Sequence, residues 1–242
     1  MRWHFGKEDQ LLVSSRSSKT VRLAGGQQSK ARASSLRQKQ GRRPQALRSA
    51  EMQRRLLDAT IALLIERGYS RFRIADVAEK AKVSRGALLH HFRTKESLII
   101  GAIEDIYRSS TAASDKRLVN AGSDLNILHV IEDSEAYYYA DEFLALVELV
   151  MSAGRNRALS KQLKQITYRY RQPLEERWAA RLAERGVDLP VARDAVWLAQ
   201  AVIRGLRIRR LVSHDAQQVE RVRDLAMRML ESLIAGSTRP TG

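Results

Sequence analysis

Apolar residues recur at helical spacing from about Glu51 onward. They follow the i, i+3/i+4, i+7 rule that places side chains on one face of an amphipathic helix. The residues on this face are Leu56, Leu57, Ala59, Leu63 and Leu64. Gly68 predicts the C-terminal end of this first helix, because glycine adopts the left-handed cap conformation at little cost.

Two short helices are predicted next, over residues 74–81 and 85–92, joined by a turn at residues 82–84. Ser84 is a favourable N-cap for the later helix. Two short helices in this arrangement form a helix-turn-helix. Their apolar residues, which can share a small core with Leu63 and Leu64, are Ile74, Val77, Ala78, Ala81, Leu88 and Phe92.

The remaining pattern is helical as well, which makes the predicted fold class all-α. Thr94 can cap a fourth helix with Glu96 in its first turn, and this helix is expected to connect two domains. Five more helices are predicted at 125–139, 141–153, 157–185, 190–212 and 215–235. Pro173 should kink or divide the third of these, because proline removes a helical hydrogen bond.

The predicted organisation has three parts: a disordered basic arm (1–50), a DNA-binding domain (51–97) and a helical regulatory and dimerisation domain (98–242). The arm is rich in Ser, Gln, Lys and Arg and lacks a sustained apolar period, so it cannot offset its ordering entropy. It either has no role, or it holds DNA phosphates or enters a minor groove. The arm residues favoured for the minor groove are Arg42, Arg43 and Arg48.

Charge and composition narrow the function classes. The formal net charge of +16 favours polyanionic partners. With no cysteine, disulfide scaffolds, iron–sulfur clusters, thiol catalysis and cysteine zinc sites are excluded. No secretory h-region and no membrane-spanning apolar stretch is visible, so a cytoplasmic protein without membrane contact is expected.

Nothing in the sequence predicts an enzyme, a cofactor or a metal. There is no Gly-rich phosphate loop after a strand, no nucleophile elbow and no convincing acid–base pair. The neighbouring His90 and His91 point about 100° apart on a helix and cannot share one ion.

The segment from Leu56 to Leu98 resembles the DNA-binding domain of the TetR/AcrR family of transcriptional regulators. The motifs that carry the resemblance are Glu66-Arg67-Gly68-Tyr69, Ile74-Ala75-Asp76-Val77-Ala78, Val83-Ser84-Arg85-Gly86-Ala87-Leu88, His91-Phe92 and Lys95-Glu96-Ser97-Leu98. The resemblance implies a homodimeric regulator, most often a repressor, that binds double-stranded operator DNA. Beyond this segment the likeness is limited to length and helical character.

The resemblance also suggests which residues touch DNA. Arg85 can read guanine through paired hydrogen bonds, Gly86 and Ala87 allow close approach or contact a thymine methyl, and His90 can donate to a base or phosphate. His91 and Lys95 match positions that contact phosphates in the family.

Three positions depart from the family pattern. Arg73 replaces a capping hydroxyl residue, so the cap is lost although a longer phosphate contact becomes available. Lys82 replaces a glycine, which disfavours a left-handed turn by about 1 kcal/mol. Leu89 replaces a phosphate-binding tyrosine, and the missing tyrosine hydroxyl should weaken DNA binding by about 1 kcal/mol.

The C-terminal half suggests a dimer and a ligand cavity. The helices at 190–212 and 215–235 are apolar on more than one side, so they can form a two-fold four-helix bundle with a second subunit, or else complete an intrachain core. An aromatic-rich set can line an effector cavity or serve as ordinary core. Its members are Tyr137, Phe143, Met151, Tyr168 and Trp178.

These observations favour a repressor that a small-molecule effector releases from a pseudo-palindromic operator. The alternative is an architectural or nonspecific nucleic-acid-binding protein in which the basic arm does most of the binding.

Overall fold

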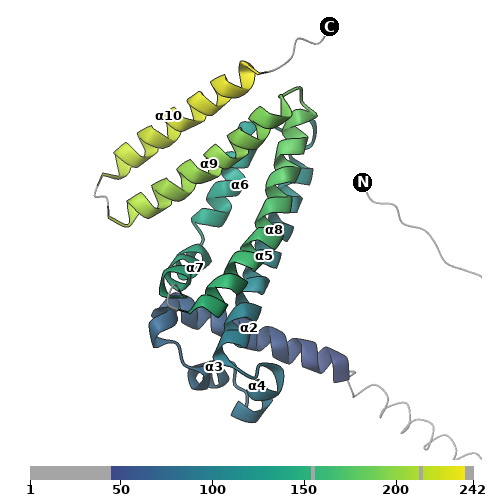
Figure 1. The fold of residues 1–242 in the computed structure, drawn as a ribbon, viewed down its shortest axis with the longest axis vertical. Coiled ribbons are helices and arrows are strands. Elements are labelled where there is room, and N and C mark those ends of the chain that lie inside the picture. Colours follow the sequence, from purple (N-terminus) through teal and green to yellow (C-terminus); the bar gives the residue numbers. More distant parts are fainter. Residues whose placement is uncertain (1–44, 154–155, 213–214, 238–242) are drawn as a thin grey trace, which may run out of the picture. The chain divides into compact units, whose positions relative to one another are not determined.

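The computed structural model describes residues 45–153, 156–212 and 215–237. Within these ranges the chain forms nine α-helices and one 3-10 helix, with no β-strand. The N-terminal helices are α2 (Gln45–Arg71), α3 (Ile74–Lys80), α4 (Arg85–His91) and α5 (Lys95–Asn120). After η1 (Gly122–Asp124) come α6 (Ile127–Tyr138), α7 (Asp141–Ser152), α8 (Arg157–Ala183), α9 (Leu189–Arg210) and α10 (Ala216–Ala235), as Figure 1 shows.

Helix α2 begins at Gln45 rather than near Glu51. Residues 45–50, which the sequence pattern assigned to the arm, are therefore helical, and they include Arg48. Gln, Ala, Leu and Arg are strong helix formers, so this segment needs no amphipathic period to extend the helix. Helical geometry is interrupted at Gly68, where φ is 70° and ψ is 173°, but α2 resumes and ends at Arg71, so Gly68 breaks the helix without forming the predicted left-handed cap.

The helix-turn-helix unit, residues 49–94, has the predicted core. Leu63, Val77 and Leu88 are each at most 2% exposed. The other predicted core residues, Leu64, Ala78, Ala81 and Phe92, are buried in the same cluster, with Ile74 packed against it. This packing fixes α4 against α2 and α3, so the remaining residues of α4 face outward.

Helix α5 continues from this unit into the C-terminal helices. A capping box starts it: the Ser97 N–H donates to Thr94 Oγ1 at 3.0 Å, and the Thr94 N–H donates to Ser97 Oγ at 3.1 Å. The predicted cap is confirmed. Farther along, α5 packs against α8, and α9 packs against α6, α8 and α10.

The sequence predicted that Pro173 kinks or divides this helix; α8 continues through Pro173 as one helix, so the division does not occur. The helical hydrogen bond lost at proline is local, whereas Leu174 and Trp178 in the following turn are each 1% exposed. Burial of these side chains holds both halves of the helix in the same core.

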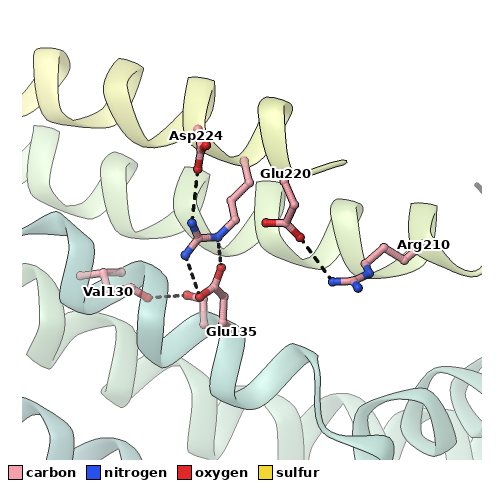
Figure 2. Close-up of polar contacts among 7 residues, drawn as sticks. Val130, Glu135, Arg210, Glu220 and Asp224 are labelled. Carbon is pink, nitrogen blue, oxygen red and sulfur yellow. Dashed lines mark hydrogen bonds and ion pairs between the residues drawn. The ribbon is translucent and has the colours of Figure 1, made fainter. Parts of the chain in front are cut away.

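Helix α10 is the last helix and packs on α9 and α6 (Figure 1). Val219 and Leu230 bury one of its faces. Arg223 donates two hydrogen bonds to Glu135 of α6, from Nε to Oε1 and, at 3.0 Å, from Nη2 to Oε2. This contact raises the pKa of Arg223. In Figure 2 Glu135 lies below the guanidinium in this contact, and Asp224 lies above it.

Candidate nucleic-acid interface and ligand cavity

The N-terminal half of α4 is capped and open to solvent. The Ala87 N–H donates to Ser84 Oγ at 3.1 Å, as expected for an N-cap. Arg85, Gly86 and His90 are exposed and Ala87 is half-buried, whereas Leu88 on the opposite face is fully buried. The structure therefore brings together the four residues predicted to face a groove.

The residues predicted around this helix lie at its edges. His91 is half-buried, with its ring 5.6 Å from that of His90. Arg73 is exposed at the start of α3 and provides no side-chain cap, as its sequence position suggested. Leu89 is 38% exposed and offers no polar atom to a phosphate.

Lys95 faces inward rather than into solvent. Its ammonium donates to the carbonyl oxygens of Phe72 at 3.0 Å and Tyr69 at 3.4 Å, and lies 4.4 Å from the centre of the Tyr69 ring. Partial burial lowers the pKa of Lys95. In this conformation the side chain closes the corner between α2 and α3, a role that its place in the sequence did not indicate.

The turn between α3 and α4 keeps a left-handed residue despite the lysine. Lys82 has a φ of 53°. The guanidinium of Arg55 on α2 donates to the Ala81 carbonyl and, at 3.2 Å, to the Lys82 carbonyl. Because these hydrogen bonds from α2 stabilise the turn, Lys82 can keep the left-handed conformation that glycine adopts more easily. Sequence reasoning missed Arg55, which is 27 positions away along the chain.

Helix α7 touches the helix-turn-helix unit at the Gly68 break. The Tyr69 N–H donates to Glu148 Oε1 at 3.1 Å. A Cβ atom at Gly68 would collide with the Glu148 carboxylate, and its φ of 70° also disfavours any other residue. Glu148 thus ties α7 to the end of the long run of α2.

Helices α5, α6, α7, α8 and α9 line an open cavity of about 740 Å³, within the usual range for small-molecule sites. We call it the tyrosine cavity. Four predicted residues line it: Tyr137, Phe143, Met151 and Tyr168. The other lining residues are Tyr107, Leu146, Val147, Val150, Ser160, Leu163, Lys164, Thr167, Arg171, Gln172, Glu175, Trp197 and Arg204.

Trp178, the fifth predicted residue, does not line the cavity. It is 1% exposed, and its indole N–H donates to Ser114 Oγ at 3.0 Å. Ser114 in turn donates to Asp133 at 2.8 Å, and Arg117 donates to the same carboxylate at 2.7 Å. Trp178 is therefore part of a structural core network, because a buried indole needs a hydrogen-bond acceptor.

Sequence reasoning missed the polar residues of the tyrosine cavity. The Tyr107 hydroxyl lies 3.0 Å from Thr167 Oγ1. Burial raises the pKa of Tyr137 well above its ordinary value, so the ring stays a neutral phenol. Burial also raises the pKa of Glu175, against the opposing effect of Arg171 and Arg204.

An apolar face on α9 and α10 is left uncovered within one chain. On α10, Leu225 is 50% exposed and Met229 is 64% exposed. The other exposed apolar residues of this face are Leu198, Val222 and Leu233. Both predicted dimer helices are therefore only half-covered by their own chain.

The remaining predictions concern the basic arm, a metal site and a membrane span. Arg42 and Arg43 fall outside the described residues, whereas Arg48 is exposed in α2. No group of three or more His, Asp or Glu side chains in the described ranges could hold a metal ion. In the same part of the chain, no helix is long and apolar enough to cross a membrane.

Known proteins share both halves of this architecture. Residues 56–102 match the family model of bacterial regulatory proteins of the tetR family. The HTH-type transcriptional regulator CymR of Pseudomonas putida is 36% identical over 184 residues, covering 76% of this chain and 91% of CymR.

Solved structures agree on the fold. A protein from Mesorhizobium loti named as a TetR-family transcriptional regulator has a TM-score of 0.64 at 18% identity, covering 79% of this chain and 99% of its own. A protein from Saccharomonospora viridis, solved in complex with choline, has a TM-score of 0.59 at 19% identity, covering 75% and 96%. The chain belongs to the TetR family of helix-turn-helix, DNA-binding transcriptional regulators.

Proposed function

We propose that this regulator is a homodimeric, cytoplasmic repressor that reads a pseudo-palindromic operator with α4 and leaves it when a small molecule fills the tyrosine cavity. The observation that carries the proposal is the outward face of α4, which is capped by Ser84 and exposed at Arg85, Gly86 and His90. A major groove about 12 Å wide accepts a helix presented in this way.

In this proposal Arg85 reads a base edge, while Gly86, Ala87 and His90 approach the groove closely. Ser84, His91 and Arg73 hold neighbouring phosphates. Lys95 reaches a phosphate only by leaving its two carbonyl acceptors, so its contribution to affinity is smaller than that of an exposed lysine.

The apolar face of α9 and α10 is the proposed dimer interface. Exposed leucine and methionine at helical spacing favour a covering helix pair, and a second copy supplies one. Gly205 supports this assignment, because it lies exposed inside α9 and a Cβ there would meet nothing within 4 Å. A glycine at such a position weakens an isolated helix, whereas it permits close approach of a partner helix.

Ligand control would pass through the helices that connect the cavity to the DNA-binding unit. Helix α5 supplies Tyr107 to the cavity and begins at the corner held by Lys95. Helix α7 supplies Val147 and Met151, and its Glu148 binds the Tyr69 N–H. A ligand that prefers one placement of these helices would shift the spacing of the two α4 helices in the dimer.

Footprinting of genomic DNA with the purified full chain tests the proposal. We expect protected sites with dyad symmetry and half-sites about 34 Å apart, or a multiple of that distance, on one face of the duplex. Uniform, sequence-independent protection would instead favour the architectural alternative, in which the basic arm dominates. A version starting at Gln45 tests the contribution of the arm. If the salt dependence of DNA affinity is the same for this version and for the full chain, the arm does not take part in DNA binding.

A further inference from the structure

A buried cation stands in the wall of the tyrosine cavity. Arg171 is only 9% exposed. Its guanidinium lies 4.5 Å from the centre of the Tyr137 ring and 5.8 Å from that of Tyr138. The guanidinium is thus held by aromatic faces, an arrangement that fixes its position without using its N–H groups.

These N–H groups lack acceptors. The nearest carboxylate oxygen, Glu175 Oε1, is 3.8 Å from Arg171 Nε, which is an ion pair without a hydrogen bond. No described residue accepts a hydrogen bond from this guanidinium. A guanidinium carries five donors, and those of Arg171 remain available to a ligand because the side chain lines the cavity.

The charge balance of the cavity is positive. Lys164, Arg171 and Arg204 line it, against Glu175 as its one lining carboxylate among the described residues. The rest of the wall is mainly aromatic and aliphatic, with Phe143 and Leu146 among its buried members. An anionic head beside an apolar body matches this division.

We propose that the effector of this regulator is a carboxylate with an aromatic or other apolar body, whose carboxylate pairs with Arg171 while the body lies against the apolar wall. The inference rests on the proposed function of the cavity and adds its ligand class. A planar carboxylate matches the guanidinium, because two parallel N–H donors can bind its two oxygens.

A cationic effector does not suit this cavity. Cations bind to proteins over aromatic faces, and one face of Tyr137 already holds the guanidinium of Arg171 at 4.5 Å from the ring centre. Choline, present in the complex of the Saccharomonospora viridis protein, is such a cation. A like charge placed beside Arg171 and Arg204 would be repelled, so the two proteins are expected to differ in ligand class despite their shared fold.

Calorimetric titration of the full chain with matched probes tests the ligand class. The probes are 2-naphthoate, benzoate and octanoate, with 2-naphthamide as the neutral and 2-naphthylmethylamine as the cationic counterpart of the first. We expect at least one carboxylate to bind, and the amide to bind roughly tenfold or more weakly than 2-naphthoate. Preferred binding of the amide or amine, or no binding of any carboxylate, would overturn the inference.

Substitutions assign the carboxylate to Arg171. Arg171→Gln should weaken carboxylate binding by roughly 10- to 100-fold, and Arg171→Lys should recover part of the loss, since it restores charge without the paired donors. Arg169→Gln is the matched control, because Arg169 lies on the same helix but is 65% exposed and pairs with Glu104. The carboxylate affinity of the Arg169→Gln variant should stay within about twofold of that of the parent chain.

Glu175→Gln separates ligand binding from a structural role of the arginine. Removing the competing carboxylate should tighten carboxylate binding by roughly three- to tenfold, whereas a purely structural ion pair predicts no gain. Operator binding without ligand, followed by fluorescence anisotropy, is measured for every variant. Retained operator binding with no carboxylate response would reject the ligand class alone, and loss of specific operator binding by the parent chain would reject the proposed function itself.

Discussion

The helix-turn-helix unit and the C-terminal helices use charge and apolar surface in opposite ways. In α4 the core-facing Leu88 is fully buried, and Arg85 lies in solvent. On α10 the reverse holds, because Met229 is 64% exposed, and within the tyrosine cavity Arg171 is 9% exposed. An apolar side chain left in solvent, or a charged side chain that is buried, marks a surface that a partner is expected to cover.

The difference shows how to distinguish binding surfaces of different kinds. An exposed arginine on a capped helix suits a hydrated polyanion, which brings its own charge. An exposed apolar face suits another protein surface, and a buried arginine without hydrogen bonds suits a small anion. The same chain therefore carries three surfaces whose partners are distinguishable by burial and charge.

The largest expected effect comes from the apolar face. Leu225→Glu combined with Met229→Glu should destabilise the dimer by roughly 3 kcal/mol or more, since two buried apolar contacts are lost and charges must be desolvated. Sedimentation velocity would show the shift toward monomer. The control is Gln217→Glu with Arg228→Glu, at two exposed polar positions of the same helix, which should leave the dimer intact. An unchanged dimer in the first variant would place the interface elsewhere.

The second effect concerns the core beneath α4. Leu88→Ala should lower the free energy of unfolding by about 2–5 kcal/mol, because it opens a cavity in a small core. Leu89→Ala, at the neighbouring exposed position, should change it by less than about 1 kcal/mol. Urea unfolding followed by circular dichroism measures both. Equal losses would mean that the two faces of α4 are not distinguished as described.

Third, the exposed arginine tests base reading. Arg85→Ala should cost about 1–3 kcal/mol of operator binding and relax discrimination at one base pair in each half-site. Anisotropy titrations with the footprinted site and its single-base variants supply the measurement. A uniform loss across all sequences would make Arg85 a phosphate contact instead.

The smallest effect concerns the turn between α3 and α4. Lys82→Gly should stabilise the unit by up to about 1 kcal/mol, because it relieves the left-handed strain at a φ of 53°. Arg55→Ala should destabilise it by about 1 kcal/mol through loss of its carbonyl hydrogen bonds. Thermal unfolding midpoints compare them. If Lys82→Gly is destabilising, the lysine side chain itself supports the turn.

Local patterns predicted most of the helices. Ser84 and Thr94 cap the helices that they were expected to cap, and the five C-terminal helices lie within a few residues of their predicted spans. Caps and amphipathic periods act over one or two turns, so their information is contained in neighbouring residues. The failure at Gln45 has the same origin, since no local period marked the extension of α2.

The sequence by itself determined the helical fold, the helix-turn-helix and the family to which they belong. Only the tertiary structure decided that Lys95 faces two carbonyls, that Trp178 is core rather than cavity, and that Arg171 stands without a hydrogen bond beside Tyr137. These outcomes depend on packing between helices that are distant along the chain. A helical period tells which residues share a face, but the neighbouring helices decide whether that face meets core, cavity or solvent.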